Sequence, residues 1–360
     1  MRVRRPAIRT FVTWSLAGFA LALVLLLAPV AYIELACRGD EESQAYRPVI
    51  ANPSFQRREA NTYLTYPEWH IVFAYDGLAE VLKAGDEYSF DYLPSVSRFW
   101  SSTCSLMRVA DEHGGADFGT RSMIHTIGVS FTIEMVMKGA YEETIGRIAA
   151  WWRGPRKTPQ DVVVAGMASD YAAFLRQTPW YRYPFRKQAN ALWAAPVDGR
   201  LRGWERRLAV GLEFQAKAVY GKVIERAAAT APAQLTIRSV VSGLDPMILS
   251  SIPEVTVVGV HGRGMEIETP RYDLFTRILA DIARRRGTIQ EIAGNDDVMV
   301  TITVPQGSDA RVQHAVVLMR MKRDGFPSDR LLVNVKVPDL APLLNALPLG
   351  DPGIEHVFDY

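Results

Sequence analysis

An uncharged stretch near the start of the chain constrains the fold more than any other feature. It runs from Phe11 to Ile33. At about 1.5 Å of rise per residue, a helix of this length spans a hydrocarbon core of about 30 Å. Trp14 and Tyr32 lie near its two ends, where amphipathic rings favour the membrane interface. We therefore predict a single-pass transmembrane anchor at residues 10–36.

The residues before this stretch predict its orientation. Residues 1–9 contain four arginines and no acid, a composition that favours the cytoplasmic side. We therefore expect a cytoplasmic basic tail at 1–9, with the bulk of the chain on the extracytoplasmic side of the cell inner (plasma) membrane. A cleaved signal peptide is the alternative, but its apolar core usually has only ~7–15 residues. A lipoprotein modified at Cys37 fits poorly because Glu34 is acidic.

The rest of the chain predicts a linker and two domains. Residues 37–62 are largely polar and are expected to form a juxtamembrane linker. Through 63–231, apolar residues recur three and four positions apart, which predicts a mainly α-helical domain. At 252–360, β-branched runs interleave with two helical patterns, which predicts an α+β domain. By analogy, a ferredoxin-like sandwich is the topology we favour there.

One helical pattern occurs twice in the predicted helical domain. The first copy carries Glu134, Lys138 and Tyr141, and the second carries Glu213, Lys217 and Tyr220. Positions i, i+4 and i+7 share one face of a helix, so each copy places an acid, a base and a phenol in one row. This internal repeat predicts two helices related by approximate two-fold symmetry. The glutamate of each copy should then pair with the lysine of the other across a shared interior.

These two rows are our candidate ligand-binding site, together with His125, which precedes the first row on an apolar helix. The simpler interpretation is structural, since a Glu–Lys pair four residues apart stabilises a helix by ~0.2–0.5 kcal/mol. The apolar surroundings favour a larger role, because burying an unpaired charge costs several kcal/mol. Mutual pairing of the rows would indicate a structural role, and a polar cavity between them would indicate a ligand.

Other motifs indicate no particular chemistry. The six histidines form no paired spacing such as His-Glu-x-x-His, so we assign no catalytic residue and expect neither a metal nor a cofactor. Gly259, Gly262 and Gly264 fit a hairpin turn better than a phosphate loop. A net charge of +2 gives no reason to expect a nucleic-acid partner. Cys37 and Cys104 can pair after export, but we do not expect this bridge because Cys37 lies beside the membrane.

Together these features predict a non-catalytic accessory protein of the cell envelope that binds a ligand or a partner. The α+β domain would present exposed strand edges to another envelope protein. The alternative is an enzyme or carrier that acts on an amphiphilic small molecule at the membrane surface, using the repeated Glu/Lys/Tyr rows. Ion pairs that fill the space between the rows would favour the first function, and a polar cavity would favour the second.

Overall fold

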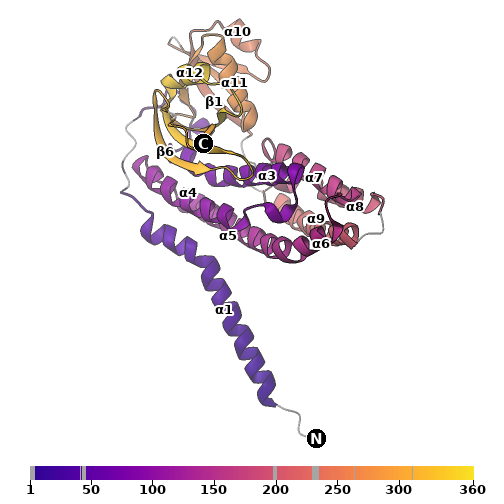
Figure 1. The fold of residues 1–360 in the computed structure, drawn as a ribbon. Helices are drawn as coiled ribbons and strands as arrows, with labels where there is room; N and C mark the ends of the chain where they lie inside the picture. Colours follow the sequence, from indigo (N-terminus) through magenta and orange to yellow (C-terminus); the bar gives the residue numbers. More distant parts are fainter. Residues whose placement is uncertain are drawn as a thin grey trace.

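A single long helix projects from a folded body (Figure 1). The computed structural model describes residues 5–40, 42, 46–197, 201–228, 235–262, 264–309 and 311–360. The long helix, α1, covers Arg5–Ala36, and its segment Thr13–Ala36 is long and apolar enough to cross a membrane. Its outer end meets the body near Ile33 and Cys37, which are both buried. These observations support the predicted membrane anchor.

The first part of the body is helical. Its helices are α2 (Ala60–Leu64), α3 (Tyr66–Ala84), α4 (Tyr92–Glu112), α5 (Phe118–Tyr141), α6 (Arg147–Arg153), α7 (Pro159–Leu175), α8 (Phe185–Ala194) and α9 (Leu201–Ala228). A π-helical turn, Glu142–Gly146, joins α5 to α6 without a break, so these three segments form one continuous rod, the α5–α6 rod. α3 packs against α4, α5 and α7, which places it at the centre of this part.

The second part of the body contains two four-stranded antiparallel sheets, with strand orders β2-β3-β1-β4 and β6-β7-β5-β8. The strands are β1 (Thr236–Ser242), β2 (Thr256–His261), β3 (Gly264–Pro270), β4 (Thr288–Ile292), β5 (Asp297–Pro305), β6 (Ala315–Lys322), β7 (Ser328–Lys336) and β8 (Gly353–Val357). The helices between them are α10 (Pro246–Ser250), α11 (Asp273–Arg284) and α12 (Val337–Ala346). The α+β character expected here is therefore present. The α+β part starts at β1, which lies between the predicted domains 63–231 and 252–360.

The two sheets repeat one plan. In each, the first strand lies inside the sheet, the next two pair at one edge, and a helix leads to the last strand at the other edge. Equivalent strands keep a nearly constant spacing. β3 and β7 begin at Gly264 and Ser328, a difference of 64, and β4 and β8 begin at Thr288 and Gly353, a difference of 65. The two sheets therefore share one topology, which the sequence patterns did not predict.

Helix α11 connects the cores of the two sheets. Ile278 and Ile282 pack in the core of the first sheet, whereas Phe275 and Leu279 pack in the core of the second sheet with α12. Because apolar residues cover more than one side of α11, the helix is buried on both sides. The two sheets are consequently held together by α11, and also by α12, which packs against β4 of the first sheet.

The helical part and the second sheet also share a core. Met299 of β5 and Phe358, which follows β8, belong to the same buried cluster as Tyr66 and Trp69. The hydroxyl of Thr62 accepts the Met299 N–H at 3.0 Å and donates to the Phe358 carbonyl at 3.3 Å. The body is therefore continuous between α2 and the second sheet.

Part of the segment predicted as a juxtamembrane linker is packed against β4. Glu291, which is fully buried, accepts hydrogen bonds from the N–H groups of Val49 and Ile50 at 2.5 and 2.9 Å. It also accepts the Tyr46 hydroxyl at 2.7 Å. One carboxylate thus fixes the path of the chain between the anchor and the body.

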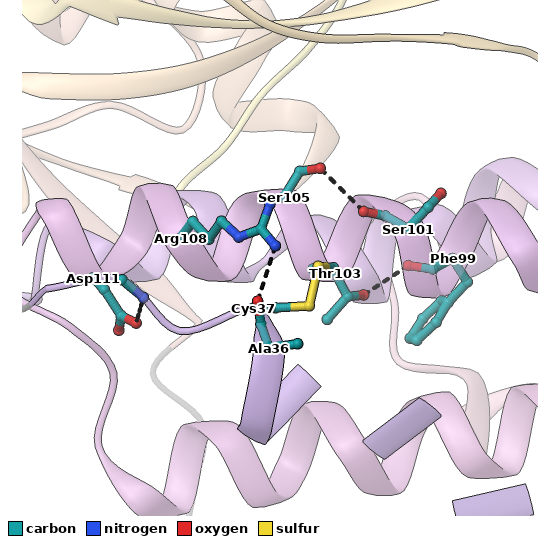
Figure 2. The surroundings of a disulfide bond; sticks show 10 residues. Ala36, Cys37, Phe99, Ser101, Thr103, Ser105, Arg108 and Asp111 are labelled. Carbon is teal, nitrogen blue, oxygen red and sulfur yellow. Dashed lines mark hydrogen bonds between the residues drawn. A yellow bond between two sulfur atoms is a disulfide. The ribbon is translucent and has the colours of Figure 1, made fainter. Parts of the chain in front are cut away.

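A disulfide joins Cys37 to Cys104, with 5.1 Å between their Cα atoms. This corrects our expectation that the membrane-proximal Cys37 stays unpaired. The reason is that α4 passes beside the end of α1, as Figure 2 shows. Arg108 of α4 donates to the Ala36 carbonyl next to the bridge, at 2.9 Å. The covalent bond and this hydrogen bond hold the outer end of α1 against α4.

Candidate functional site

Four of the six row residues meet between α5 and α9. Lys138 Nζ lies 3.3 Å from Glu213 Oε2, and Lys217 Nζ lies 2.5 Å from Glu134 Oε1. Lys217 also contacts Glu213 on its own helix, at 3.0 Å. The expected cross-pairing is therefore confirmed, since each lysine reaches the glutamate of the other copy.

These pairs are one end of a longer series of contacts that we call the ion-pair network. Acids and bases alternate along it, with N–O distances from 2.5 to 3.3 Å, in the order Glu134, Lys217, Glu213, Lys138, Glu87, Arg206, Glu205, Arg202, Asp161, Arg153 and Asp86. Its members come from α5, α6, α7, α9 and the turn after α3. Each member between the two ends contacts an opposite charge on both sides. The network therefore ties together helices that are distant in sequence.

Charge balance fixes the ionisation of the lysines. Burial would lower the pKa of Lys138, but the carboxylates of Glu213 and Glu87 outweigh it and raise the pKa well above its usual range. Burial would also lower the pKa of Lys217, but nearby negative charges, of which Glu134 is the largest, outweigh burial and raise the pKa. Burial would raise the pKa of Glu213, but the two lysines lower it to about 2. Both lysines are therefore cationic at neutral pH, and neither can serve as a base or nucleophile.

A carboxyl group that our sequence analysis missed lies at the π-helical turn. One Glu142 oxygen lies 2.8 Å from Arg206 Nη2, while the other is buried and has no hydrogen-bond partner among the described residues. Burial and then the charge of Glu87 raise the pKa of Glu142 to about 7, although Arg206 opposes the shift. A Cβ at position 146 would collide with the unpartnered oxygen, so Glu142 can hold this position only beside a glycine or after its side chain shifts. Glu142 therefore changes charge near neutral pH, a property common at functional sites.

The two row tyrosines occupy different surroundings. Tyr141 donates to Glu205 Oε1 at 2.5 Å and so joins the ion-pair network. Tyr220 lies outside the network, where its half-exposed ring stacks on Trp180 with 5.5 Å between centroids. The approximate symmetry of the repeat thus holds for the glutamates and lysines but fails at the third position.

Tyr75 of α3 is the phenol that contacts the paired rows. Its hydroxyl donates to Glu134 and accepts a hydrogen bond from Lys217 Nζ at 3.0 Å. Arg206 could have been found from the sequence, because it lies seven residues before Glu213 on the same helical face. Tyr75 lies on another helix, and no spacing in the sequence relates it to the repeat.

His125 lies apart from the network, beside the membrane anchor. Its Nε2 is 2.7 Å from Glu34 Oε1 of α1, and Arg121 Nε is 3.9 Å from the same oxygen. These side chains line a groove of about 550 Å³ between α1 and α5. The apolar part of the lining comes from Leu27, Val30, Phe118 and Val129. The predicted site residues are therefore divided among three places: the ion-pair network, the surroundings of Tyr220 beside Trp180, and the groove beside His125.

One cluster among the described residues has the donor atoms of a metal site. Glu59, His113 and Asp297 each bring one such atom within 4.8 Å of the others. His113 Nδ1 contacts Glu59 at 2.5 Å, and Lys336 Nζ contacts Asp297 at 2.5 Å. Because these partners neutralise the acids without an ion, we interpret the cluster as a clamp between the helical part and β5. The expectation that the protein binds no metal stays a prediction.

Comparison with known proteins adds no relative from which a function could be transferred. No protein-family model matches the chain, and no curated protein or solved structure shows significant similarity to it. The function is therefore inferred from the ion-pair network, the groove at α1 and the edges of the sheets.

Proposed function

We propose that the protein is a single-pass membrane protein of the cell envelope that acts as a non-catalytic accessory protein and binds a protein partner. Its folded body would lie on the extracytoplasmic side of the inner membrane. The basic residues at the start of the chain support this orientation. The Cys37–Cys104 disulfide supports it independently, because disulfides persist in oxidising compartments and are rare in the cytoplasm.

The main support for a non-catalytic role is that the charged groups of the ion-pair network are all paired with one another. Lys138 contacts two carboxylates, Glu87 and Glu213, and Lys217 also contacts two, Glu134 and Glu213. A catalytic or ligand-binding row needs a donor or acceptor that is free to meet a substrate. Here the charged groups of the repeat satisfy one another, which supports a scaffold that positions the sheets.

The arrangement of the first sheet supports a docking role. The element order β1-α10-β2-β3-α11-β4, with strand order β2-β3-β1-β4, supports the ferredoxin-like topology that we infer for this unit. Its edge strand β2 has β3 as its strand neighbour and also contacts the short helix α10, and Val260 on it is 70% exposed. The corresponding edge of the second sheet, β6, packs against α4. We therefore assign β2 as the edge that receives a strand of the partner.

Site-specific crosslinking in the native host tests this assignment. A photoreactive amino acid at Val260 in the full-length protein should give one discrete crosslinked product. The same residue at Val316 on β6, which is 65% exposed, is the matched control and should not give that product. No product at Val260, or the same products at both positions, would reject the docking role.

A reporter fusion tests the orientation. An enzyme that is active only outside the cytoplasm, fused after Tyr360, should be active. Activity of a cytoplasmic reporter at the same position, with an inactive extracytoplasmic one, would reverse the proposed topology.

The alternative function is an enzyme or carrier that acts on an amphiphilic small molecule. One observation favours it, namely the apolar groove of about 550 Å³ beside His125. This groove lies at α1 and not between the Glu/Lys/Tyr rows. If the rows nevertheless bind such a molecule, Lys138→Met should abolish its co-purification and leave the thermal stability unchanged.

A further inference from the structure

The α5–α6 rod has an apolar face that the described parts of the protein leave exposed. We call it the outer stripe, and it consists of Ile133, Met137, Ile145, Ile148, Trp151 and Trp152. Met137 is 68% exposed, and the two tryptophans are 80% and 72% exposed. Exposed aromatic and aliphatic side chains in one row are unusual on a water-facing helix and mark an interaction surface.

The side of the rod that faces the body buries apolar residues such as Ile124, Phe131 and Met135, as in an ordinary surface helix. The same side also carries Glu134 and Lys138, whose charges are paired within the ion-pair network. A surface helix in water places its charges outward and its apolar residues inward. The outer stripe departs from this pattern because its exposed residues are apolar, which indicates that it faces an apolar or amphipathic medium.

The outer stripe continues the face on which α5 meets the membrane anchor. Val129 lines the groove against Leu27 and Val30 of α1. Helical steps of four residues lead from Val129 to Ile133 and on to Met137, so these side chains share one face. Figure 1 shows the α5–α6 rod along the side of the body from which α1 projects. The stripe is therefore an extension of the surface that already contacts a membrane-spanning helix.

We propose that the outer stripe lies in the interfacial layer of the bilayer that α1 crosses, with Trp151 and Trp152 among the lipid headgroups. Tryptophan prefers this layer because its ring is apolar and its N–H is polar. The contact of His125 with Glu34 at 2.7 Å keeps the beginning of the rod beside the end of α1 that meets the body. An amphipathic helix held in this position binds lipid through buried apolar area.

Fluorescence quenching by brominated lipid tests the proposal on the full-length protein in nanodiscs. The background variant is Trp14→Phe, which removes the tryptophan inside the anchor. Brominated phosphatidylcholine should still quench part of its emission. Adding Trp151→Phe and Trp152→Phe should remove at least half of that remaining quenching. Equal quenching in the two variants would overturn the proposal.

A matched control places an exposed tryptophan far from the anchor. Met247 of α10 is 82% exposed, and α10 lies at the end of the body opposite α1 (Figure 1). Met247→Trp in the Trp14→Phe background should add emission that brominated lipid does not quench. The competing occupant of the stripe is a second copy of the protein. If Met137→Glu converts dimers to monomers in sedimentation and Trp151 is not quenched, the stripe is a protein interface and the lipid assignment is wrong.

Discussion

The ammonium nitrogen of Lys138 lies 2.7 Å from Glu87 and 3.3 Å from Glu213, and the side chain of Lys138 is only 13% exposed. One buried cation therefore joins the turn after α3 to α9. Removing it would leave two carboxylates without their shared partner in a poorly solvated place.

Lys138→Met should consequently lower the free energy of unfolding by about 3 kcal/mol. It would leave the carboxylates of Glu87 and Glu213 with one cation each. Adding Glu213→Gln should recover part of this loss. Lys83→Met is the matched control, because its pair with Glu80 is exposed and should contribute at most about 1 kcal/mol. Thermal and denaturant unfolding of the full-length protein measures all three. A loss from Lys138→Met no larger than that of the control would show that the network contributes little.

Glu142 should make stability depend on pH. Its folded-state pKa of about 7 lies above the ordinary value of 4.5, so the folded protein binds a proton more tightly than the unfolded chain does. Its stabilising contribution is complete below about pH 4.5 and is lost as the pH rises through about 7. The loss should reach about 3 kcal/mol. Glu142→Gln should flatten this part of the pH profile, and Glu143→Gln, at an exposed position, should leave it unchanged. Equal slopes in wild type and Glu142→Gln would contradict the shifted pKa.

The disulfide should be oxidised in the cell and should stabilise the body. Alkylation of intact cells should leave Cys37 and Cys104 unmodified until a reductant is added. Because the bridge closes a loop with a sequence separation of 67, Cys104→Ser should destabilise the protein by about 4 kcal/mol. Cys37→Ser should have the same effect, since either change opens the same loop. Free thiols in untreated cells would remove this support for the extracytoplasmic location.

The position of β1 predicts which fragments can fold. β1 lies between β3 and β4, so a fragment covering 252–360 lacks an inner strand of the first sheet. A fragment covering 235–360 retains both sheets and should show a cooperative thermal transition, whereas 252–360 should not. Circular dichroism during heating distinguishes them. Cooperative unfolding of the shorter fragment would show that β1 is dispensable.

The sequence was informative where a pattern is local. The anchor follows from one uninterrupted apolar run, and the pairing of Lys138 with Glu213 follows from two matching rows on helices. Tyr220 departs from the repeat because its neighbour is Trp180, which belongs to a turn that has no counterpart near Tyr141. Local spacing defines a face of a helix, but the partner of that face depends on the whole packing arrangement.

Contacts between distant segments were not predictable from these patterns. The Cys37–Cys104 bridge depends on the path of α4 past the end of α1, and Glu87 joins the network from a short turn with no periodicity. The shared topology of the two sheets was not predictable for a different reason. Strands need only alternating or continuous apolar residues, so two units can keep one topology while sharing few identical side chains.

The attachment of α1 to α4 has a mechanical consequence. A transmembrane helix that is longer than the local hydrocarbon thickness tilts to keep its apolar length covered. Here the end of that helix is covalently fixed to the body through Cys37. The bond restricts rotation of the body relative to α1. A tilt of the anchor is therefore passed on to the body, except for the part that a bend of α1 at Pro29 takes up. Through this bond the thickness of the bilayer would set the direction in which the two sheets point into the space beyond the membrane.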